Sequence, residues 1–193
     1  GRRRRRAAAR QDKHQNDEAM KSFQAAIEAD AEWQPAFLGA ARALADQNPP
    51  QAAQLATKAL AMNPQDVATQ VFMAELAVDN GKRDDARKML QKALEINPQS
   101  LEALSLLAGL DYVEDKLTDF DATVAKVLAI APTHGEVYRV AGNLAAHNYR
   151  FEEAAKALRE GMALHQGGGG LEDWLFLALA EHGLGRAEEA KKA

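Results

Sequence analysis

A proline recurs at a fixed interval in the middle of the chain. Asn63-Pro64 is followed by Asn97-Pro98 and then by Ala131-Pro132, and the two intervals are equal. Each proline ends a similar phrase, namely LATKALAMNP, LQKALEINP and VAKVLAIAP. A fixed period of about 34 residues predicts a repeat protein, in which one helix-turn-helix unit stacks on the next.

The composition favours helices throughout. The chain has 193 residues, of which 47% are hydrophobic and only 6% aromatic, and it is rich in alanine. Ala, Leu, Glu, Lys, Gln and Arg are the strongest helix formers, so we expect an all-α protein. Cysteine is absent, which excludes disulfides and thiolate metal sites.

The repeat predicts one domain over residues 1–193, because stacked units contact only their neighbours. Six units are expected, the last of them truncated: 1–32, 33–66, 67–100, 101–134, 135–170 and 171–193.

Turn residues predict where each unit bends. In the first unit we expect one helix over residues 2–13 and a second from Asp17. Gly81 should be the left-handed residue of the third unit. The turn at residues 115–118 lacks glycine, so a less regular corner is expected there. The sixth unit should turn at Gly183 and Gly185.

Charge is distributed unevenly along the chain. Residues 1–13 carry a net +6 and include the run Arg2 to Arg6, whereas the rest of the chain carries −10 to give the overall −4. Adjacent arginines repel one another, so we expect residues 1–6 to fray or stay disordered. The cluster is able to bind nucleic acid or an acidic surface, although the acidic body argues against nucleic acid, and a plain solvated helix end is the alternative.

The ends of the sequence predict an excised fragment. The chain does not begin with methionine and it ends abruptly on AEEAKKA. No apolar run approaches the roughly 20 residues that a membrane span needs. No secretory segment follows the arginines either. The compartment is left open, because a soluble fragment of this kind fits the cytoplasm or the periplasm.

Residues that carry chemistry are scarce. None of the five histidines forms a zinc-binding pair, so no metal site is expected. Gly167 to Gly170 are not a phosphate loop, because no strand precedes them and no Lys-Ser/Thr follows. Acidic pairs such as Glu152-Glu153 suit a helix N-terminus better than acid–base catalysis. We therefore expect no enzymatic activity and no cofactor.

The positions of small and large residues resemble the tetratricopeptide repeat, and more loosely the long arrays of bacterial proteins. Counted from Leu171, the pattern is matched by Trp174, Leu177, Ala178 and Ala190. The resemblance covers essentially the whole chain. It implies a right-handed superhelical solenoid of stacked antiparallel helix pairs, which binds a peptide or protein segment in a concave groove.

By position, the resemblance also implies which residues line that groove. The candidate partner-binding residues are Phe37, Val71, Glu75, Tyr112, Arg139, Asn143, His147 and His182. Arg139 and Asn143 lie one helical turn apart, as in family members that hold a C-terminal carboxylate. Phe176 stands where that clamp wants a further asparagine. The alternative is that Arg139 pairs with Glu136 or Glu102.

Tyr112, Phe37 and Val71 form an aromatic and apolar strip that is able to receive a peptide. The alternative is that Phe37 and Val71 belong to the core between repeats.

The main functional prediction is a non-enzymatic scaffold for a peptide or protein ligand of unknown identity. The first alternative is a spacer or self-association module of a larger bacterial protein, acting through the apolar end face of Trp174, Leu175 and Leu179. The second alternative is binding of nucleic acid or an acidic surface through the N-terminal arginines.

Overall fold

The computed structural model describes the backbone of residues 2–164 and 171–192, and the side chains of residues 16–164 and 173–185. Over these residues the backbone forms ten α-helices and no β-strand, which confirms the all-α prediction. The chain divides into two compact units, residues 1–96 and 97–193. A single superhelix over the whole chain stays a prediction.

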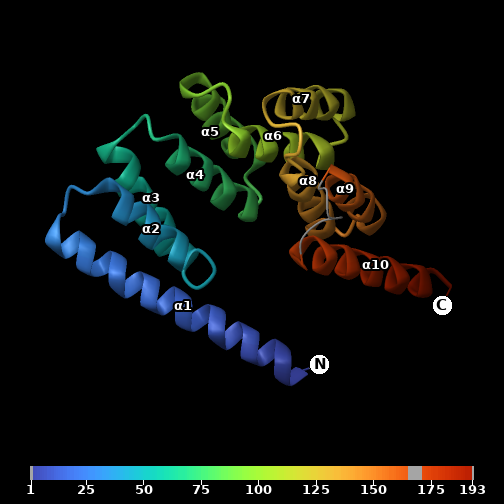
Figure 1. Ribbon diagram of the computed structural model, residues 1–193, viewed down its shortest axis with the longest axis horizontal. Coiled ribbons are helices and arrows are strands. Elements are labelled where there is room, and N and C mark those ends of the chain that lie inside the picture. The colour runs from blue at the N-terminus through green and yellow to red at the C-terminus, as the bar shows by residue number, and fades with distance from the viewer. Residues whose placement is uncertain (1, 165–170, 193) are drawn as a thin grey trace. The chain divides into compact units, whose positions relative to one another are not determined.

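Unit 1 contains the first five helices, coloured blue to green in Figure 1. Each of them contacts the next along the chain. Their bounds are α1 (Arg2–Ala29), α2 (Gln34–Leu44), α3 (Pro49–Met62), α4 (Val67–Asp79) and α5 (Arg83–Ile96).

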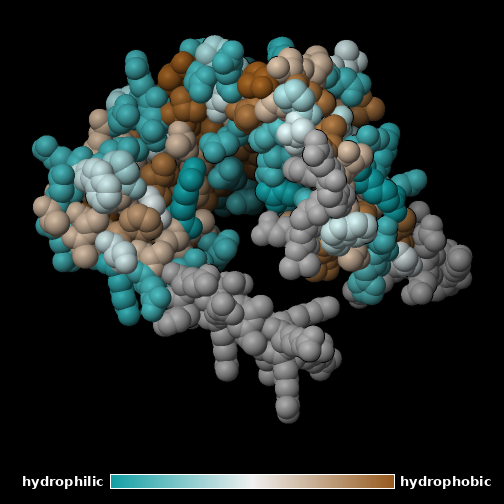
Figure 2. Space-filling view, in the orientation of Figure 1, coloured by the Kyte–Doolittle hydropathy of each residue, from teal (hydrophilic) through white to brown (hydrophobic). Residues whose placement is uncertain are grey.

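Unit 2 contains the other five helices, coloured green to red in Figure 1. The α6 helix contacts α7 and α8, α8 contacts α9, and α10 lies mainly against α9. Their bounds are α6 (Leu101–Val113), α7 (Leu117–Ile130), α8 (Glu136–His147), α9 (Phe151–Leu164) and α10 (Leu171–Lys192). Hydrophilic residues cover much of the surface of the described parts in Figure 2.

The helices repeat along the chain at the same interval as the prolines. The second helices of four hairpins begin at Pro49, Arg83, Leu117 and Phe151, and each step equals the step from Pro64 to Pro98. The sequence places good caps at several starts. Asn48 accepts a hydrogen bond from the Gln51 amide at 3.3 Å. Side-chain caps of this kind satisfy amides that a helix N-terminus leaves unpaired.

Three corners share one backbone geometry. Gly81, Asp115 and Tyr149 have φ angles of 72°, 59° and 61°, and they are separated by the interval of the prolines. The residue after each donates back across the helix end; Lys116 N, for example, donates to Asp111 O at 2.9 Å. This pattern is the Schellman motif. The irregular corner predicted at residues 115–118 is therefore wrong, because aspartate tolerates the left-handed conformation without glycine.

The first helix is longer than the sequence predicted. Residues 2–29 form one continuous helix, so the break expected between residues 13 and 17 is absent. Residues 14–16 are His, Gln and Asn, and none of these stops a helix as proline does. The side chains of residues 2–15 lie outside the described part, and the predicted disorder of residues 1–6 stays a prediction.

The last helix is also unbroken. The turn expected at Gly183 and Gly185 does not form, because α10 runs as one helix from Leu171 to Lys192. Glycine in a helix interior costs about 1 kcal/mol relative to alanine but does not forbid the helix.

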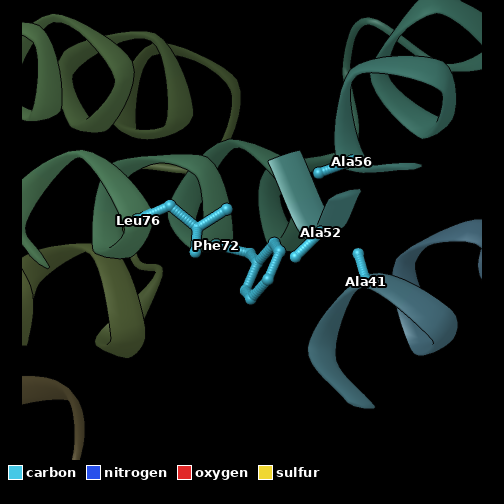
Figure 3. Close-up of a cluster of buried hydrophobic side chains, with 5 residues drawn as sticks. All are labelled: Ala41, Ala52, Ala56, Phe72 and Leu76. Atoms are coloured by element: carbon cyan, nitrogen blue, oxygen red, sulfur yellow. The ribbon is translucent and has the colours of Figure 1, made fainter. Parts of the chain in front are cut away.

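Small residues allow the helices of each unit to approach closely. In unit 1, Phe72 and Leu76 of α4 lie against Ala52 and Ala56 of α3, and Ala41 of α2 completes the cluster (Figure 3). Burying one large side chain such as Phe72 among alanines stabilises the stack by about 1.5–3 kcal/mol.

Glycines leave space for large side chains of the neighbouring helix, because they have no side chain of their own. A Cβ added at Gly142 of α8 would lie 2.7 Å from Leu158 Cγ and 3.1 Å from the Ala154 carbonyl oxygen of α9. A Cβ added at Gly109 of α6 would lie 2.9 Å from both Val140 and Leu144 of α8. These contacts fix α8 between α6 and α9, and so they fix the side chains that α8 presents.

Candidate functional site

The α8 helix carries three of the predicted contacts in one row. Arg139, Asn143 and His147 follow one another at four-residue spacing, so each lies about 6 Å further along the helix axis. Val137, Ala141 and Ala145, on the other side of α8, are fully buried. The buried side packs α8 against its neighbours. On the other side, Arg139 and Asn143 are partly exposed and His147 is exposed.

Arg139 pairs with a glutamate on its own helix. Its Nε donates to Glu136 Oε2 at 2.6 Å, and its Nη2 donates to Glu136 Oε1. The two side chains are 28% and 37% exposed, so water screens the pair only in part. The pairing with Glu136 that the sequence offered as an alternative is thus present in this structure, and it presents the guanidinium in a fixed orientation.

Asn143 has an amide oxygen with no partner. Its Oδ1 is buried and accepts no hydrogen bond within the described part of the chain. A buried acceptor left unsatisfied costs about 1–3 kcal/mol. One turn further on, His147 Nδ1 lies 2.8 Å from the Asn143 backbone oxygen. That contact requires a proton on Nδ1, so Nε2 of the neutral ring is an acceptor on an exposed side chain.

Tyr112 lies inside unit 2 rather than on an open strip. Its side chain on α6 is 9% exposed, and its hydroxyl donates to the Glu153 carbonyl oxygen at 3.1 Å. The ring lies 4.9 Å from that of Phe120. Burial raises the pKa of Tyr112 above its ordinary value of 10.0, and the negative charge of Glu153 raises it further.

In unit 1 the predicted apolar contacts are also buried. Phe37 is 6% exposed and Val71 is 2% exposed, so both belong to the helix interfaces that the sequence named as the alternative. Glu75 is exposed on α4. The predicted strip of Tyr112, Phe37 and Val71 is therefore not an open surface within either unit.

The α10 helix places His182 in solvent, together with an apolar face. Trp174, Leu175 and Leu179 are more than half exposed. These three residues are the end face that the sequence predicted for self-association.

Two polar contacts that join neighbouring hairpins were missed by the sequence analysis. Ser105 of α6 is 1% exposed, and its Oγ lies 3.4 Å from His134 Nε2 ahead of α8. Arg150, at the start of α9, donates from Nη1 to the Val113 carbonyl oxygen at 2.9 Å and from Nη2 to Asp115 at 2.5 Å. Such pairs join residues about one repeat apart, and helical periodicity does not reveal them.

Within the described side chains, no group of three or more histidines, aspartates or glutamates is able to hold a metal ion. None of the helices searched is both long enough and apolar enough to cross a membrane.

Solved structures share this fold at low sequence identity. The TPR protein TTC0263 of Thermus thermophilus aligns with a TM-score of 0.67 and 17% identity, over 86% of this chain and 90% of that one. YrrB, described as a TPR protein with an unusual peptide-binding site, aligns with a TM-score of 0.53 and 22% identity, over 93% and 85% of the two chains.

A third structure, of the Cut9-Hcn1 assembly of the APC/C, aligns with a TM-score of 0.64 and 16% identity, over 87% of this chain and 33% of that one. No curated protein sequence is significantly similar to this chain. The model of the tetratricopeptide repeat family matches residues 43–110 and 77–144, which together span more than half of the sequence. The chain belongs to the tetratricopeptide repeat family.

Proposed function

We propose that this protein is a non-enzymatic scaffold that binds an extended peptide or protein segment, and that the row Arg139, Asn143 and His147 on α8 is its principal contact surface. The observation that carries the proposal is the unsatisfied Oδ1 of Asn143, next to a partly exposed arginine and an exposed histidine. An interaction scaffold also agrees with family membership and with the fold of the YrrB structure.

The spacing of the row suits an extended chain. Successive members lie about 6 Å apart along the helix axis. Residues on one side of an extended peptide repeat every 6.6 to 6.8 Å or so, because each residue adds about 3.3–3.4 Å. A bound strand is thus able to meet one polar side chain of the row at every second residue.

Each member of the row has a distinct chemical part. Asn143 can accept from a peptide amide at its unsatisfied Oδ1 and donate to a peptide carbonyl from Nδ2, and His147 Nε2 can accept from a peptide amide. Arg139 can bind a carboxylate in a bidentate manner. A ligand carboxylate would compete with Glu136 for the guanidinium, so binding at this position exchanges one ion pair for another.

A random library of short peptides with free C-terminal carboxylates provides the probe. The Arg139→Ala/Asn143→Ala variant should retain about a tenth or less of the wild-type binding, since two hydrogen bonds of about 1 kcal/mol each are lost. The Arg159→Ala variant is the matched control, because Arg159 pairs with Glu181 on an exposed face of α9. Its binding should equal that of the wild type.

The same peptides made as C-terminal amides separate the two roles of the row. If the amides bind more weakly than the acids, Arg139 binds the C-terminal carboxylate of the peptide. If the two bind equally, the row binds only the backbone groups of the peptide. Equal binding by the double variant and the wild type, or a wild type that retains no peptide, would remove α8 as the contact surface. Glu75 and His182 are exposed, each within its own unit, and both stay predicted contacts.

The N-terminal arginines suggest a second test. If they bind nucleic acid, affinity for a DNA duplex should fall steeply with salt, and deletion of residues 1–10 should abolish it. Affinity that is independent of this deletion would exclude the arginine cluster.

A further inference from the structure

Asn80 and Gly81 stand at the corner between α4 and α5, and they are the only Asn-Gly pair in the sequence. In such a pair the backbone nitrogen of the glycine can attack the side-chain carbonyl carbon of the asparagine, because glycine has no side chain to obstruct the approach. Three other asparagines precede proline, whose nitrogen carries no hydrogen, and three precede residues larger than glycine. The first three are Asn48, Asn63 and Asn97, and the others are Asn16, Asn143 and Asn148. The sequence thus makes Asn80 the asparagine most susceptible to this reaction.

The folded corner keeps the two reacting groups apart. Asn80 has a ψ of 9°, so Gly81 N is nearly eclipsed with the Asn80 backbone nitrogen and lies away from the Asn80 Cβ. The Asn80 side chain is also tied down, because Nδ2 donates to the Leu76 carbonyl oxygen at 2.7 Å. Gly81 N donates to the Val78 carbonyl oxygen at 2.9 Å. Attack requires rotation about the Asn80 Cα–C bond, and this rotation breaks the hydrogen bond from Gly81.

Little besides these hydrogen bonds closes the corner. Asn80 and Gly81 are both exposed, and nothing lies within 4 Å of the Cβ that Gly81 lacks. The corner is therefore held by its main-chain bonds and by the packing of α4 against α5. Segments of this kind open at a lower free energy than the whole domain. Water and base reach the two residues each time the corner opens.

We propose that Asn80 is a site of spontaneous deamidation, which the folded corner restrains and each opening of the α4–α5 hairpin allows. Solvent base removes the amide proton of Gly81, and the nitrogen attacks Asn80 Cγ. The Cγ–Nδ2 bond breaks, the leaving nitrogen takes a proton from water and departs as ammonia, and a succinimide ring joins the two residues. Water then opens the ring at either carbonyl, which yields aspartate or isoaspartate in place of the asparagine.

Neither product can restore the corner. Both carry a carboxylate, which has no hydrogen to donate to the Leu76 carbonyl oxygen that Nδ2 now meets at 2.7 Å. The carboxylate also adds a negative charge at the C-terminal end of α4, where the helix dipole disfavours it. Isoaspartate lengthens the main chain as well, which disrupts the backbone hydrogen bonds of the corner. Deamidation therefore loosens the hairpin, and this inference goes beyond peptide binding by α8 and does not depend on it.

Peptide mass spectrometry of the full chain, incubated at neutral pH, tests the proposal. One sample is folded and the other is unfolded in urea, and the conversion of each asparagine is followed with time. Asn80 should convert at least about tenfold faster in urea, which corresponds to an opening free energy of about 1.4 kcal/mol or more in the folded protein. Equal rates in the two samples would overturn the restraint. Faster conversion of any other asparagine in urea would overturn the assignment to Asn80.

Asn148 is the matched control, because it ends α8 as Asn80 ends α4. Its ψ is 13°, and its Nδ2 donates to the Leu144 carbonyl oxygen at 2.7 Å, but Tyr149 follows it. In urea, Asn148 should stay unconverted while Asn80 reacts. The Tyr149→Gly variant creates a second Asn-Gly pair, so its Asn148 should convert in urea as fast as Asn80 and more slowly in the folded protein. An unreactive Asn148 in this variant would contradict the chemistry proposed for Asn80.

Asn80→Asp reproduces one product and tests its effect on the fold. This variant lacks the Nδ2 donor and carries the added charge, so it should unfold at a lower urea concentration than the wild type. The aged protein, in which Asn80 has converted, should show the same downward shift of the midpoint. Unchanged midpoints for the variant and the aged protein would overturn the claim that deamidation loosens the hairpin.

Discussion

Tyr149 holds a backbone conformation that suits glycine. Its φ of 61° lies in the left-handed region, where an L-residue other than glycine costs about 1–2 kcal/mol. The side chain is 82% exposed, and its ring meets that of Phe151 edge-on at 6.1 Å. The strain is tolerated because two backbone hydrogen bonds of the corner depend on this conformation, whichever residue occupies it.

We expect Tyr149→Gly to stabilise the protein. The relief of about 1–2 kcal/mol is offset by the larger unfolded-state entropy of glycine, about 0.5–1 kcal/mol, which leaves a net gain between about 0 and 1.5 kcal/mol. Urea unfolding should show a higher midpoint with an unchanged slope. Gly81→Ala is the opposite control, because it adds a Cβ where φ is 72°, and it should lower the midpoint.

The buried phenol of Tyr112 makes stability depend on alkaline pH. Its pKa is raised in the folded state by burial and by Glu153, so the folded protein keeps this proton at a pH where the unfolded chain loses it. The contribution is complete below pH 10 or so and is lost as the pH rises through the folded pKa. The free energy of unfolding should therefore decline above about pH 10.

Tyr112→Phe checks that assignment. It should lower stability near pH 7 by about 0.5–1.5 kcal/mol, because the hydrogen bond to the Glu153 carbonyl oxygen is lost. It should also flatten the decline above pH 10. A decline of unchanged steepness would place the alkaline sensitivity elsewhere, for example at Tyr138, whose pKa burial also raises.

At the scale of the helices, periodicity predicted most of the fold and less of the site. Proline and glycine signals located the hairpins, because these residues change the backbone itself. The prediction failed at residues 14–16 and at Gly183 to Gly185, because only weak helix stops interrupt good helix formers at both places.

The candidate site shows the same limit. Phe37, Val71 and Tyr112 were predicted to line a groove, and the structure buries all three. Successive residues of a helix are about 100° apart around its axis, and the stripe that faces the core is at least about 100° wide. A residue that lies next to the predicted groove position can therefore belong to the core instead. Sequence spacing alone does not tell which stripe faces solvent. The charged Arg139 stays partly exposed, as the cost of burying a charge predicts, and its role as a contact stays a prediction.

Because α8 and α9 are in close contact, one added methyl group between them should lower the stability of the protein. Gly142→Ala places a Cβ 2.7 Å from Leu158 Cγ, and overpacking of about 1–3 kcal/mol should outweigh the gain in helix propensity of about 1 kcal/mol. Gly185→Ala is the matched control, since nothing lies within 4 Å of its added Cβ. Thermal unfolding should show a lower midpoint for the first variant and an equal or higher one for the second.

Arg150 joins two hairpins, so it should contribute more to stability than a residue at an exposed corner usually does. It donates to Val113 and Asp115 across the repeat boundary and also pairs with Glu153. Arg150→Ala should cost about 1.5–3 kcal/mol, whereas Arg159→Ala, which breaks an exposed pair, should cost less than about 1 kcal/mol. Similar losses for the two variants would mean that the bonds across the boundary contribute little.

At the scale of the molecule, contacts within each unit run mainly between neighbouring helices. In such a chain, a local defect is transmitted only as far as its neighbours. Phe72→Ala should cost about 3–5 kcal/mol within unit 1, because Phe72 fills the cluster between α3 and α4. Hydrogen exchange should then accelerate in α2 to α4 while α8 and α9 keep their protection. Uniform acceleration over both units would mean that the whole chain unfolds as one body.

The matching corners at Gly81, Asp115 and Tyr149 have a consequence for how such a chain grows. Their geometry depends on main-chain bonds, so three different side chains serve the same purpose. A stretch of DNA encoding residues 83–116 begins and ends at equivalent points of this geometry. Duplication of that stretch in frame would add one helical repeat, and both of its ends would join through corners of the existing geometry. The equivalent corners therefore allow the chain to lengthen by duplication.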